Sequence, residues 1–262
     1  MNVDSWLKKA RTRIKSLDAE LLLLFVIQQD DRSYLAAHPE YRLNDEDVVL
    51  LNRLVDLRQQ GMPLAYILGE KEFYGRKFYV NQHVLIPRSD SEVIIEIAKS
   101  LNPRPKKILD VGTGCGILAI TLSLELPGTR VTAIDVSQAA LFVASKNSIY
   151  LKGRVDFLQS DLLKELPKAE KFDLIVANLP YVDIGWPWRS KELAWEPGLA
   201  LYSGDGGMEL LKKFLDEAKG RTKVLILECD PCQHKTMIKY AENLGFKYEA
   251  TRGFQLVFKG KD

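Results

Sequence analysis

Apolar and polar residues follow two different periodicities along this chain, and the change occurs near residue 106. In the first part, the apolar positions of the stretch LDAELLLLFVI, which begins at Leu17, recur at helical spacing. Asn44 can cap another helix, in which acidic residues precede an apolar face and Gly61 follows the end. These patterns predict a small helical domain over residues 1–68.

A segment rich in aromatic residues follows this helical region. In KEFYGRKFYV, aromatic and β-branched residues flank Gly75, which predicts a β-hairpin. We place this hairpin in a linker over residues 69–88. Just beyond it, Ser89 and Glu92 match a capping box and predict a helix over residues 91–101.

From Lys106 onward, short apolar strands alternate with helices. The strand-like segments are KKILDV, RVTAID, VDFLQ, FDLIVAN and KVLILEC, and helical patterns over 116–126, 137–149, 205–219 and 233–244 separate most of them. This alternation predicts a parallel sheet covered on both faces. The tail adds GFKYEA and GFQLVFK, two strands with no helix between them. We therefore expect an α/β fold over residues 89–262, with a mostly parallel seven-stranded sheet and an antiparallel edge.

One long connection has no clear periodicity. It runs from Leu179 to about Gly204 and contains Trp186, Trp188 and Trp195. Long loops without regular structure are often functional. The tryptophans could equally serve only to pin an ordinary loop, so the role of this loop stays open.

Composition narrows the function classes. The formal net charge is only +2 over 262 residues, which argues against a strongly basic nucleic-acid-binding module. Three cysteines in a chain of this length indicate a reducing compartment, and we expect a cytoplasmic protein. The most apolar stretch is too short to span a bilayer. The basic N-terminus could mimic a mitochondrial presequence, but Asp4 and Asp18 interrupt it.

The stretch ILDVGTGCGIL places three glycines between a strand and a helix. Gly112, Gly114 and Gly116 allow a tight turn in which the backbone approaches a ligand. A dinucleotide fingerprint would need its third glycine at Ile117, and the lysine of a phosphate-binding loop is missing. The turn therefore fits a ligand without a diphosphate.

Two carboxylates follow the next strands. Asp135 can accept both hydroxyls of a ribose, and Asp161 can accept from an exocyclic amine. Together with the glycine turn they outline an adenosine site, as S-adenosyl-L-methionine requires, and Asp110 is a candidate neighbour of its sulfonium. In the alternative interpretation, the glycines form only a turn and the aspartates only cap helices.

The order of LDVGTGCG, AIDVS, SDLL and NLPYV resembles class I S-adenosylmethionine-dependent methyltransferases, which have a Rossmann-like fold. The rest of the chain resembles the release-factor glutamine methyltransferases known as PrmC or HemK. The stretches GMPLAYILGEKEFYGRKFYV, VLIPRSDSE, EPGLALYSGDGG and LILECDPCQ carry this resemblance. It implies methylation of the side-chain amide nitrogen of the glutamine in the Gly-Gly-Gln loop of peptide chain release factors, with the helical domain helping to hold that partner.

The resemblance also implies the site residues. The expected cofactor-binding residues are Asp110, Gly112, Thr113, Gly114, Cys115, Gly116, Asp135, Asp161, Leu162 and Asn178. The Asn-Pro-Pro-Tyr motif of the family falls on Asn178, Leu179, Pro180 and Tyr181, with Asn178, Pro180 and Tyr181 as the catalytic residues.

The chemistry suits these residue types. The carboxamide oxygen of Asn178 and the backbone carbonyl of Pro180 can each accept one amide N–H, and Tyr181 can pack against the planar amide. Orientation of the amide nitrogen toward the methyl group would then supply most of the rate acceleration of methyl transfer. Arg88 and Glu92 could orient the substrate or form an ion pair at a helix start. None of the histidines is expected to act.

Other substrates and other sites stay open. Leu179 replaces the usual proline, and the form NLPY is also found in rRNA adenine N6-dimethyltransferases, whose acceptor is likewise a planar amine. IPRSDSE looks like the sister enzymes that methylate a ribosomal protein. A cofactor-binding module without catalysis is the third possibility. Cys229, Cys232 and His234 form a weak redox or zinc signal. We expect no metal, no membrane or nucleic-acid partner, and a monomer.

Overall fold

A computed structural model describes residues 1–187 and 190–260. The described residues cluster into two compact units, which are treated separately. The first contains residues 1–69 and 190–195, and the second contains residues 70–187 and 196–260.

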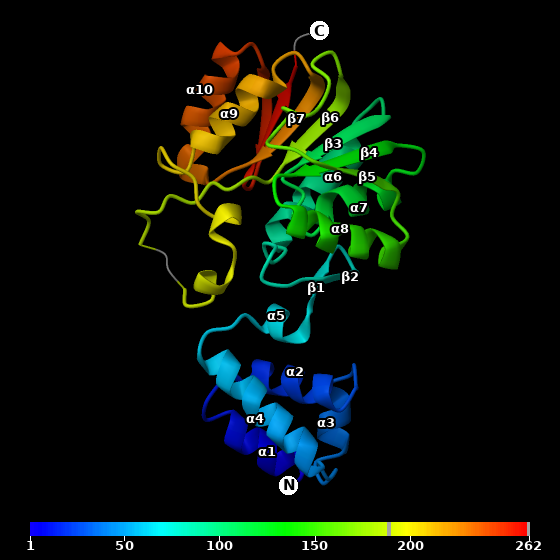
Figure 1. Ribbon diagram of the computed structural model, residues 1–262, viewed down its shortest axis with the longest axis vertical. Coiled ribbons are helices and arrows are strands. Elements are labelled where there is room, and N and C mark those ends of the chain that lie inside the picture. Colours follow the sequence, from blue (N-terminus) through cyan, green and yellow to red (C-terminus); the bar gives the residue numbers. More distant parts are fainter. Residues whose placement is uncertain (188–189, 261–262) are drawn as a thin grey trace. The chain divides into compact units, whose positions relative to one another are not determined.

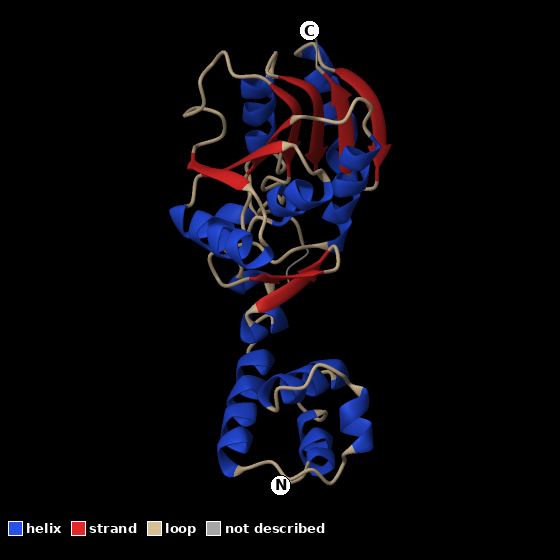
Figure 2. Cartoon of the chain, turned by 90° about the vertical axis from the view of Figure 1, so that its right-hand side faces the viewer, coloured by secondary structure: helices blue, strands red, loops and turns tan. Residues whose placement is uncertain are grey.

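The first unit is helical, as its periodicity predicts (Figure 2). Its helices are α1 (Val3–Ala10), α2 (Ser16–Val26), α3 (Ser33–Ala37), α4 (Asp45–Gln59) and α5 (Leu64–Leu68). The Asn44 side chain accepts a hydrogen bond from the Asp47 N–H at 2.6 Å, which confirms the predicted cap of α4. Trp6, Leu22 and Leu51 are fully buried in the core between α1, α2 and α4.

The second unit begins with the predicted hairpin. Strands β1 (Glu70–Phe73) and β2 (Arg76–Tyr79) pair antiparallel. The predicted capping box at Ser89 is wrong: Ser89–Ser91 form a 3₁₀ turn before α6 (Glu92–Ser100), with no side-chain cap. The reason is that the Glu92 carboxylate accepts the backbone N–H of Tyr74, at 2.8 Å, and so anchors the hairpin.

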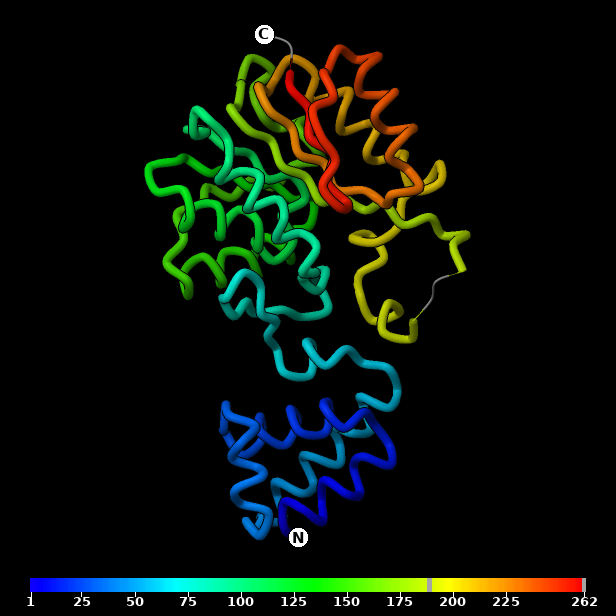
Figure 3. Tube along the Cα trace, turned by 180° about the vertical axis from the view of Figure 1, so that it is seen from behind, coloured from blue at the N-terminus to red at the C-terminus, as the bar shows by residue number. Residues whose placement is uncertain are grey.

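The predicted seven-stranded sheet is confirmed, in the order β5-β4-β3-β6-β7-β9-β8. Its strands are β3 (Lys107–Val111), β4 (Arg130–Asp135), β5 (Val155–Gln159), β6 (Phe172–Ala177), β7 (Thr222–Glu228), β8 (Lys247–Arg252) and β9 (Gln255–Lys259). The first five run parallel, whereas β9 is antiparallel to both β7 and β8. Figure 3 shows the last two strands in red at this edge of the sheet.

Helices cover both faces of this sheet (Figure 1). They are α7 (Ile117–Glu125), α8 (Gln138–Leu151), α9 (Glu209–Ala218) and α10 (His234–Asn243), together with α6. Strand residues alternate between two cores: Leu174 and Val176 pack in the cluster with α6 and α7, and Ile175 and Ala177 in the cluster with α9 and α10. This alternation is why the strands read as continuous apolar runs.

In its described residues, the long connection after β6 contains two short 3₁₀ turns, η2 (Leu193–Trp195) and η3 (Gly198–Ala200). Trp186 and Trp195 are half-buried, in different units, and Trp188 lies outside the described residues. No helix in the described part of the chain is long and apolar enough to cross a membrane.

Candidate active site

The strand order reverses at β3, whose neighbours are β4 on one side and β6 on the other. In such sheets, ligands bind beyond the carboxyl ends of the strands at the reversal. The register pairs Val111 with Ile134 and with Ala177. The residues that follow these positions, Gly112, Asp135 and Asn178, are therefore brought together at one edge.

A cavity of ≈ 350 Å³ lies at this edge. Most of the predicted site residues line it: Arg88, Gly112, Thr113, Gly114, Cys115, Asp135, Asp161, Leu162, Asn178, Leu179 and Pro180. Sequence reasoning missed other parts of the wall, among them His83, Val136, Ser160, Leu199 and Leu210. Four predicted residues are not part of the wall, namely Asp110, Gly116, Tyr181 and Glu92.

Asp110 lies beneath the glycine turn. Its Oδ2 accepts the Thr113 hydroxyl at 2.6 Å and the Ala119 N–H at 3.2 Å, so this carboxylate braces the turn against α7. Its Oδ1 has no partner among the described residues. Burial raises the pKa of Asp110 to about 7. Asp110 is not part of the cavity wall, and its hydrogen bonds brace the glycine turn.

The glycines of the turn meet different needs. A Cβ at Gly116 (φ 88°) would lie 2.7 Å from Ile120 Cδ1 and 3.2 Å from Ala144 Cβ, so this glycine permits close packing of α7 and α8. A Cβ at Gly114 would meet no atom within 4 Å. Because Gly114 lines the cavity, its bare backbone leaves space there, whereas Gly116 is not part of the cavity wall and has a packing role.

Asp135 is positioned by backbone donors. Its Oδ2 accepts the Gly114 N–H and its Oδ1 accepts the Ser137 N–H, both at 2.9 Å. A carboxylate offers about four lone-pair sites, so about two remain for further donors. Burial raises the pKa of Asp135, which is the expected result of removing a carboxylate from water.

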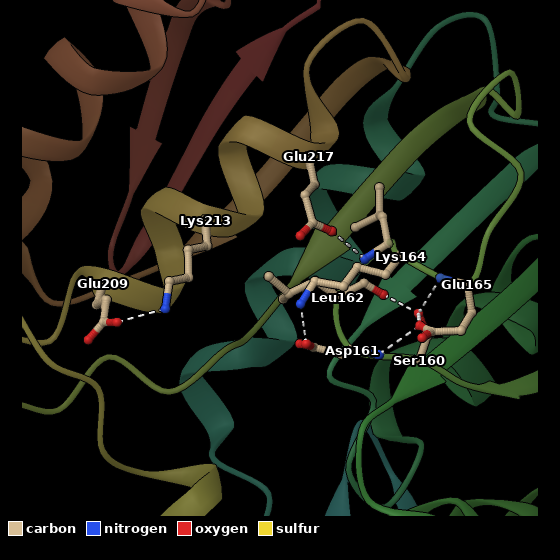
Figure 4. Close-up of polar contacts among 9 residues, drawn as sticks. Ser160, Asp161, Leu162, Lys164, Glu165, Glu209, Lys213 and Glu217 are labelled. Carbon is tan, nitrogen blue, oxygen red and sulfur yellow. Dashed lines mark hydrogen bonds and ion pairs between the residues drawn. The ribbon is translucent and has the colours of Figure 1, made fainter.

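The loop after β5 is shaped by a local polar network (Figure 4). The Ser160 hydroxyl bonds to the Leu162 carbonyl and to Glu165, and the Asp161 N–H also donates to Glu165. These contacts hold Leu162 at a φ of 51°, in the left-handed region that a leucine rarely adopts. The Asp161 carboxylate is paired with Lys164 on the surface.

The loop after β6 presents acceptors. The Nδ2 atom of Asn178 donates a hydrogen bond to Ser91 Oγ at 2.8 Å. Neither Asn178 Oδ1 nor the Pro180 carbonyl takes part in a hydrogen bond with the described residues. Tyr181 differs from the prediction: it packs on the core under α9 and α10, and its hydroxyl donates to Glu228 Oε1 at 3.3 Å. Burial raises the pKa of this phenol.

Leu179 connects the two main loops. It is 5% exposed, and a Cβ on Gly112 (φ 72°) would lie 2.7 Å from its Cδ2. The leucine therefore packs directly over the glycine turn.

Arg88 and Glu92 have different surroundings. The Arg88 guanidinium lines the cavity and pairs with Glu196, a nearly buried carboxylate that also accepts the Ile86 N–H at 2.9 Å. Glu92 instead bonds to the hairpin backbone and is not part of the cavity wall. The prediction of a substrate contact is therefore unsupported for Glu92, as is an Arg88–Glu92 ion pair.

Two buried side-chain amides hydrogen-bond to backbone groups of the loops around the cavity. Gln233 Nε2 donates to the carbonyls of Tyr181 and Gly206, each at 2.8 Å. Asn147 donates to the carbonyls of Tyr79 and Cys115, and accepts the Tyr79 N–H. Both amides satisfy backbone groups that regular structure leaves unpaired. The sequence singled out neither role; Gln233 lies in the stretch LILECDPCQ, which carries the family resemblance, whereas Asn147 lies in no such stretch.

The cavity fits an adenosine-containing ligand. Asp135 keeps free acceptor capacity, and Gly114 leaves open space beside it. No group of three or more metal-ligating side chains is present in the described residues. Burial raises the pKa of Cys229 to about 12, and the contact with Asp230 raises that of Cys232 to about 11, opposite to a reactive redox pair.

Comparison with known proteins agrees with this geometry. Residues 90–185 match the methyltransferase small domain, and residues 4–69 match the PrmC N-terminal domain. The release factor glutamine methyltransferase of Koribacter versatilis is 40% identical over 211 residues, covering 79% of this chain and 75% of that protein. The one of Dictyoglomus turgidum is 36% identical, covering 87% and 82%.

Among solved structures, the hMettl16 catalytic domain in complex with the MAT2A 3′UTR hairpin 6 superposes with a TM-score of 0.57. The match covers 89% of this chain and 94% of that chain at 16% identity, and so it concerns the fold alone.

The sheet order, the glycine turn and the strand-end carboxylate define a class I methyltransferase. The identities of 40% and 36% with the two release factor glutamine methyltransferases extend over most of both chains. The chain belongs to the release factor glutamine methyltransferase family.

Proposed function

We propose that this protein transfers a methyl group from S-adenosyl-L-methionine to the side-chain amide nitrogen (N5) of the glutamine in the Gly-Gly-Gln motif of peptide chain release factors. The observation that carries the proposal is the pair of unused acceptors at Asn178 Oδ1 and the Pro180 carbonyl, on the wall of the cavity. Family membership supports the choice of a glutamine acceptor.

The cofactor would be held by the glycine turn and the loops after β4 and β5. Asp135 would accept the ribose hydroxyls with its remaining lone pairs, and Asp161 and Leu162, which line the cavity, would contact the base. When bound, S-adenosyl-L-methionine supplies an electrophilic methyl group. Asp110 contributes by bracing the turn from below.

The acceptor amide would be oriented by the loop after β6. A primary amide has two N–H groups, and Asn178 Oδ1 and the Pro180 carbonyl accept one each. The nitrogen is then held in one orientation without a strong base, so catalysis depends on positioning. Leu179 and Arg88 line the cavity beside this point and would contact the residues that flank the glutamine. Tyr181 acts by holding the loop.

We further propose that the helical unit helps to dock the release factor. In this proposal the chain consists of a helical docking domain (1–68), a β-hairpin linker (69–88) and a methyltransferase domain (89–262). The match of residues 4–69 to the PrmC N-terminal domain supports this role. We also propose a monomer in the cytoplasm; the three free cysteines support the reducing compartment.

The test uses purified protein, cofactor and intact release factor, followed by mass spectrometry of the Gly-Gly-Gln peptide. A gain of one methyl group on the glutamine supports the proposal, and Asn178→Ala protein is the negative control. The same reaction is run with ribosomal proteins and with rRNA, because NLPY is shared with adenine methyltransferases. Methylation of one of these in place of the release factor would refute the proposed substrate.

A further inference from the structure

A buried carboxylate lies next to the acceptor loop. Glu228 ends β7, and the register pairs Ala177 with Leu227, so Glu228 and Asn178 follow neighbouring strand positions. Glu228 is 1% exposed, yet it does not line the cavity. A buried carboxylate without a countercharge is costly unless its hydrogen bonds serve a purpose.

Glu228 has three side-chain donors. Its Oε2 lies 2.7 Å from Ser91 Oγ and 3.0 Å from Gln255 Nε2, and its Oε1 lies 3.3 Å from the Tyr181 hydroxyl. The same Gln255 nitrogen is 3.0 Å from the Asp90 carbonyl, which can only accept. The group that faces Glu228 is therefore the amide NH₂ of Gln255, and Glu228 Oε2 is an acceptor.

The direction of the next hydrogen bond follows from this one. A serine hydroxyl has one proton, and Ser91 donates it to the carboxylate of Glu228. Toward Asn178, Ser91 Oγ can then only accept, so the atom at 2.8 Å is the NH₂ of the asparagine. The carboxamide oxygen of Asn178 is left for the cavity.

We infer that Glu228 is a positioning residue which, through Ser91, fixes the carboxamide of Asn178 with its oxygen toward the acceptor amide. This inference rests on the proposed function for its catalytic consequence, but the orientation of Asn178 is a property of the protein alone.

The inference predicts what happens when the polarity is lost. A leucine at position 228 removes the acceptor of the Ser91 proton, so Ser91 can then donate to the carboxamide oxygen of Asn178. The carboxamide would rotate, and its NH₂ would face the substrate N–H group that Asn178 Oδ1 otherwise accepts. Two donors facing each other do not bond, so the acceptor nitrogen loses its orientation. A glutamine at position 228 would keep its oxygen toward Ser91, because the NH₂ of Gln255 faces the same position.

The first measurement needs no substrate. Protein labelled with ¹⁵N at asparagine side chains gives an NH₂ signal for Asn178, identified by its loss in Asn178→Ala. In the native protein we expect this NH₂ to exchange slowly with solvent. Glu228→Leu and Ser91→Ala should each abolish that protection, whereas Ser91→Thr and Glu228→Gln should keep it, because the hydroxyl and its acceptor remain.

The matched control is Glu196→Gln, which alters another buried carboxylate that has no bond to Ser91 or Asn178. It should leave the Asn178 signal unchanged. If Glu228→Leu and Ser91→Ala leave the chemical shift and the exchange rate of the Asn178 NH₂ unchanged, the inference is overturned, whatever the enzyme methylates.

The second measurement is kinetic. Glu228→Leu and Ser91→Ala should each lower kcat by about 10²-fold, with cofactor affinity by calorimetry unchanged, whereas Glu228→Gln should retain most of the activity. In a double-mutant cycle the second substitution should add little to the first, since both break one relay. If the losses of kcat in the two single variants add up in the double variant, or if each loss only matches the decrease in the folded fraction, the role of Glu228 and Ser91 is merely structural. Absence of release-factor methylation by the native protein would refute the proposed function, while the NMR result still decides the inference.

Discussion

The buried carboxylate of Asp110 allows a quantitative prediction about pH and stability. Its pKa is raised to about 7 by burial, and its Oδ1 has no partner among the described residues. Because the folded-state pKa is raised, the protonated carboxyl stabilises the fold at low pH. This contribution is fully present below the unfolded pKa of about 3.9 and is lost as pH rises through about 7.

The magnitude follows from the two pKa values. One pKa unit corresponds to about 1.4 kcal/mol, so the loss between pH 5 and pH 8 is about 2.5 kcal/mol. Asp110→Asn removes the titration and keeps an acceptor for Thr113 and Ala119. Relative to the native protein, the variant should therefore gain about 2.5 kcal/mol of unfolding free energy over that pH range.

The assay is urea unfolding of cofactor-free protein at pH 5, 6.5 and 8. Cys115 and Cys229 are buried in the second unit, so labelling them in a brief pulse at one fixed pH reports its unfolding. Asp156→Asn, at an exposed aspartate on β5, is the control and should track the native curve. If the unfolding free energies of the native and Asp110→Asn proteins change in parallel with pH, the reasoning is refuted.

Four further predictions follow from the site. Asn178→Ala should lower methyl transfer by about 10²-fold or more, with cofactor binding retained in calorimetry, because orientation of the acceptor is lost. Asp135→Ala should weaken cofactor binding by about 10²-fold in the same calorimetric assay, since bonds to a charged acceptor are removed. Gly112→Ala should lower the unfolding free energy by about 1–3 kcal/mol, and its effect should be smaller in a Leu179→Ala background, which relieves the clash. Cys232 should react with iodoacetamide at pH 8 about 10²-fold more slowly than an unperturbed thiol, given a pKa of about 11.

The fold could be predicted because its signals are local. The strands are continuous apolar runs separated by helical periodicity, and Gly112 with Asp135 follows strand ends that a parallel sheet must bring together. The predicted cavity residues are mostly those placed by this rule.

The errors and omissions depend on tertiary contacts. Glu92 matched a cap, but the hairpin 18 residues earlier takes its carboxylate. Tyr181 was predicted to face the substrate, but the register puts Glu228 within reach of its hydroxyl. Ser91 was missed because its partners are 87 and 137 residues away in sequence, and no local pattern reports such distances.

Asn147 links two segments that the sequence keeps far apart. Its single carboxamide bonds to the hairpin at Tyr79 and to the glycine turn at Cys115. Displacement of either segment strains bonds to the other, so the two should open to solvent together. A ligand that rigidifies the glycine turn should consequently slow hydrogen exchange at the Tyr79 amide, which makes that amide a remote reporter of cofactor occupancy.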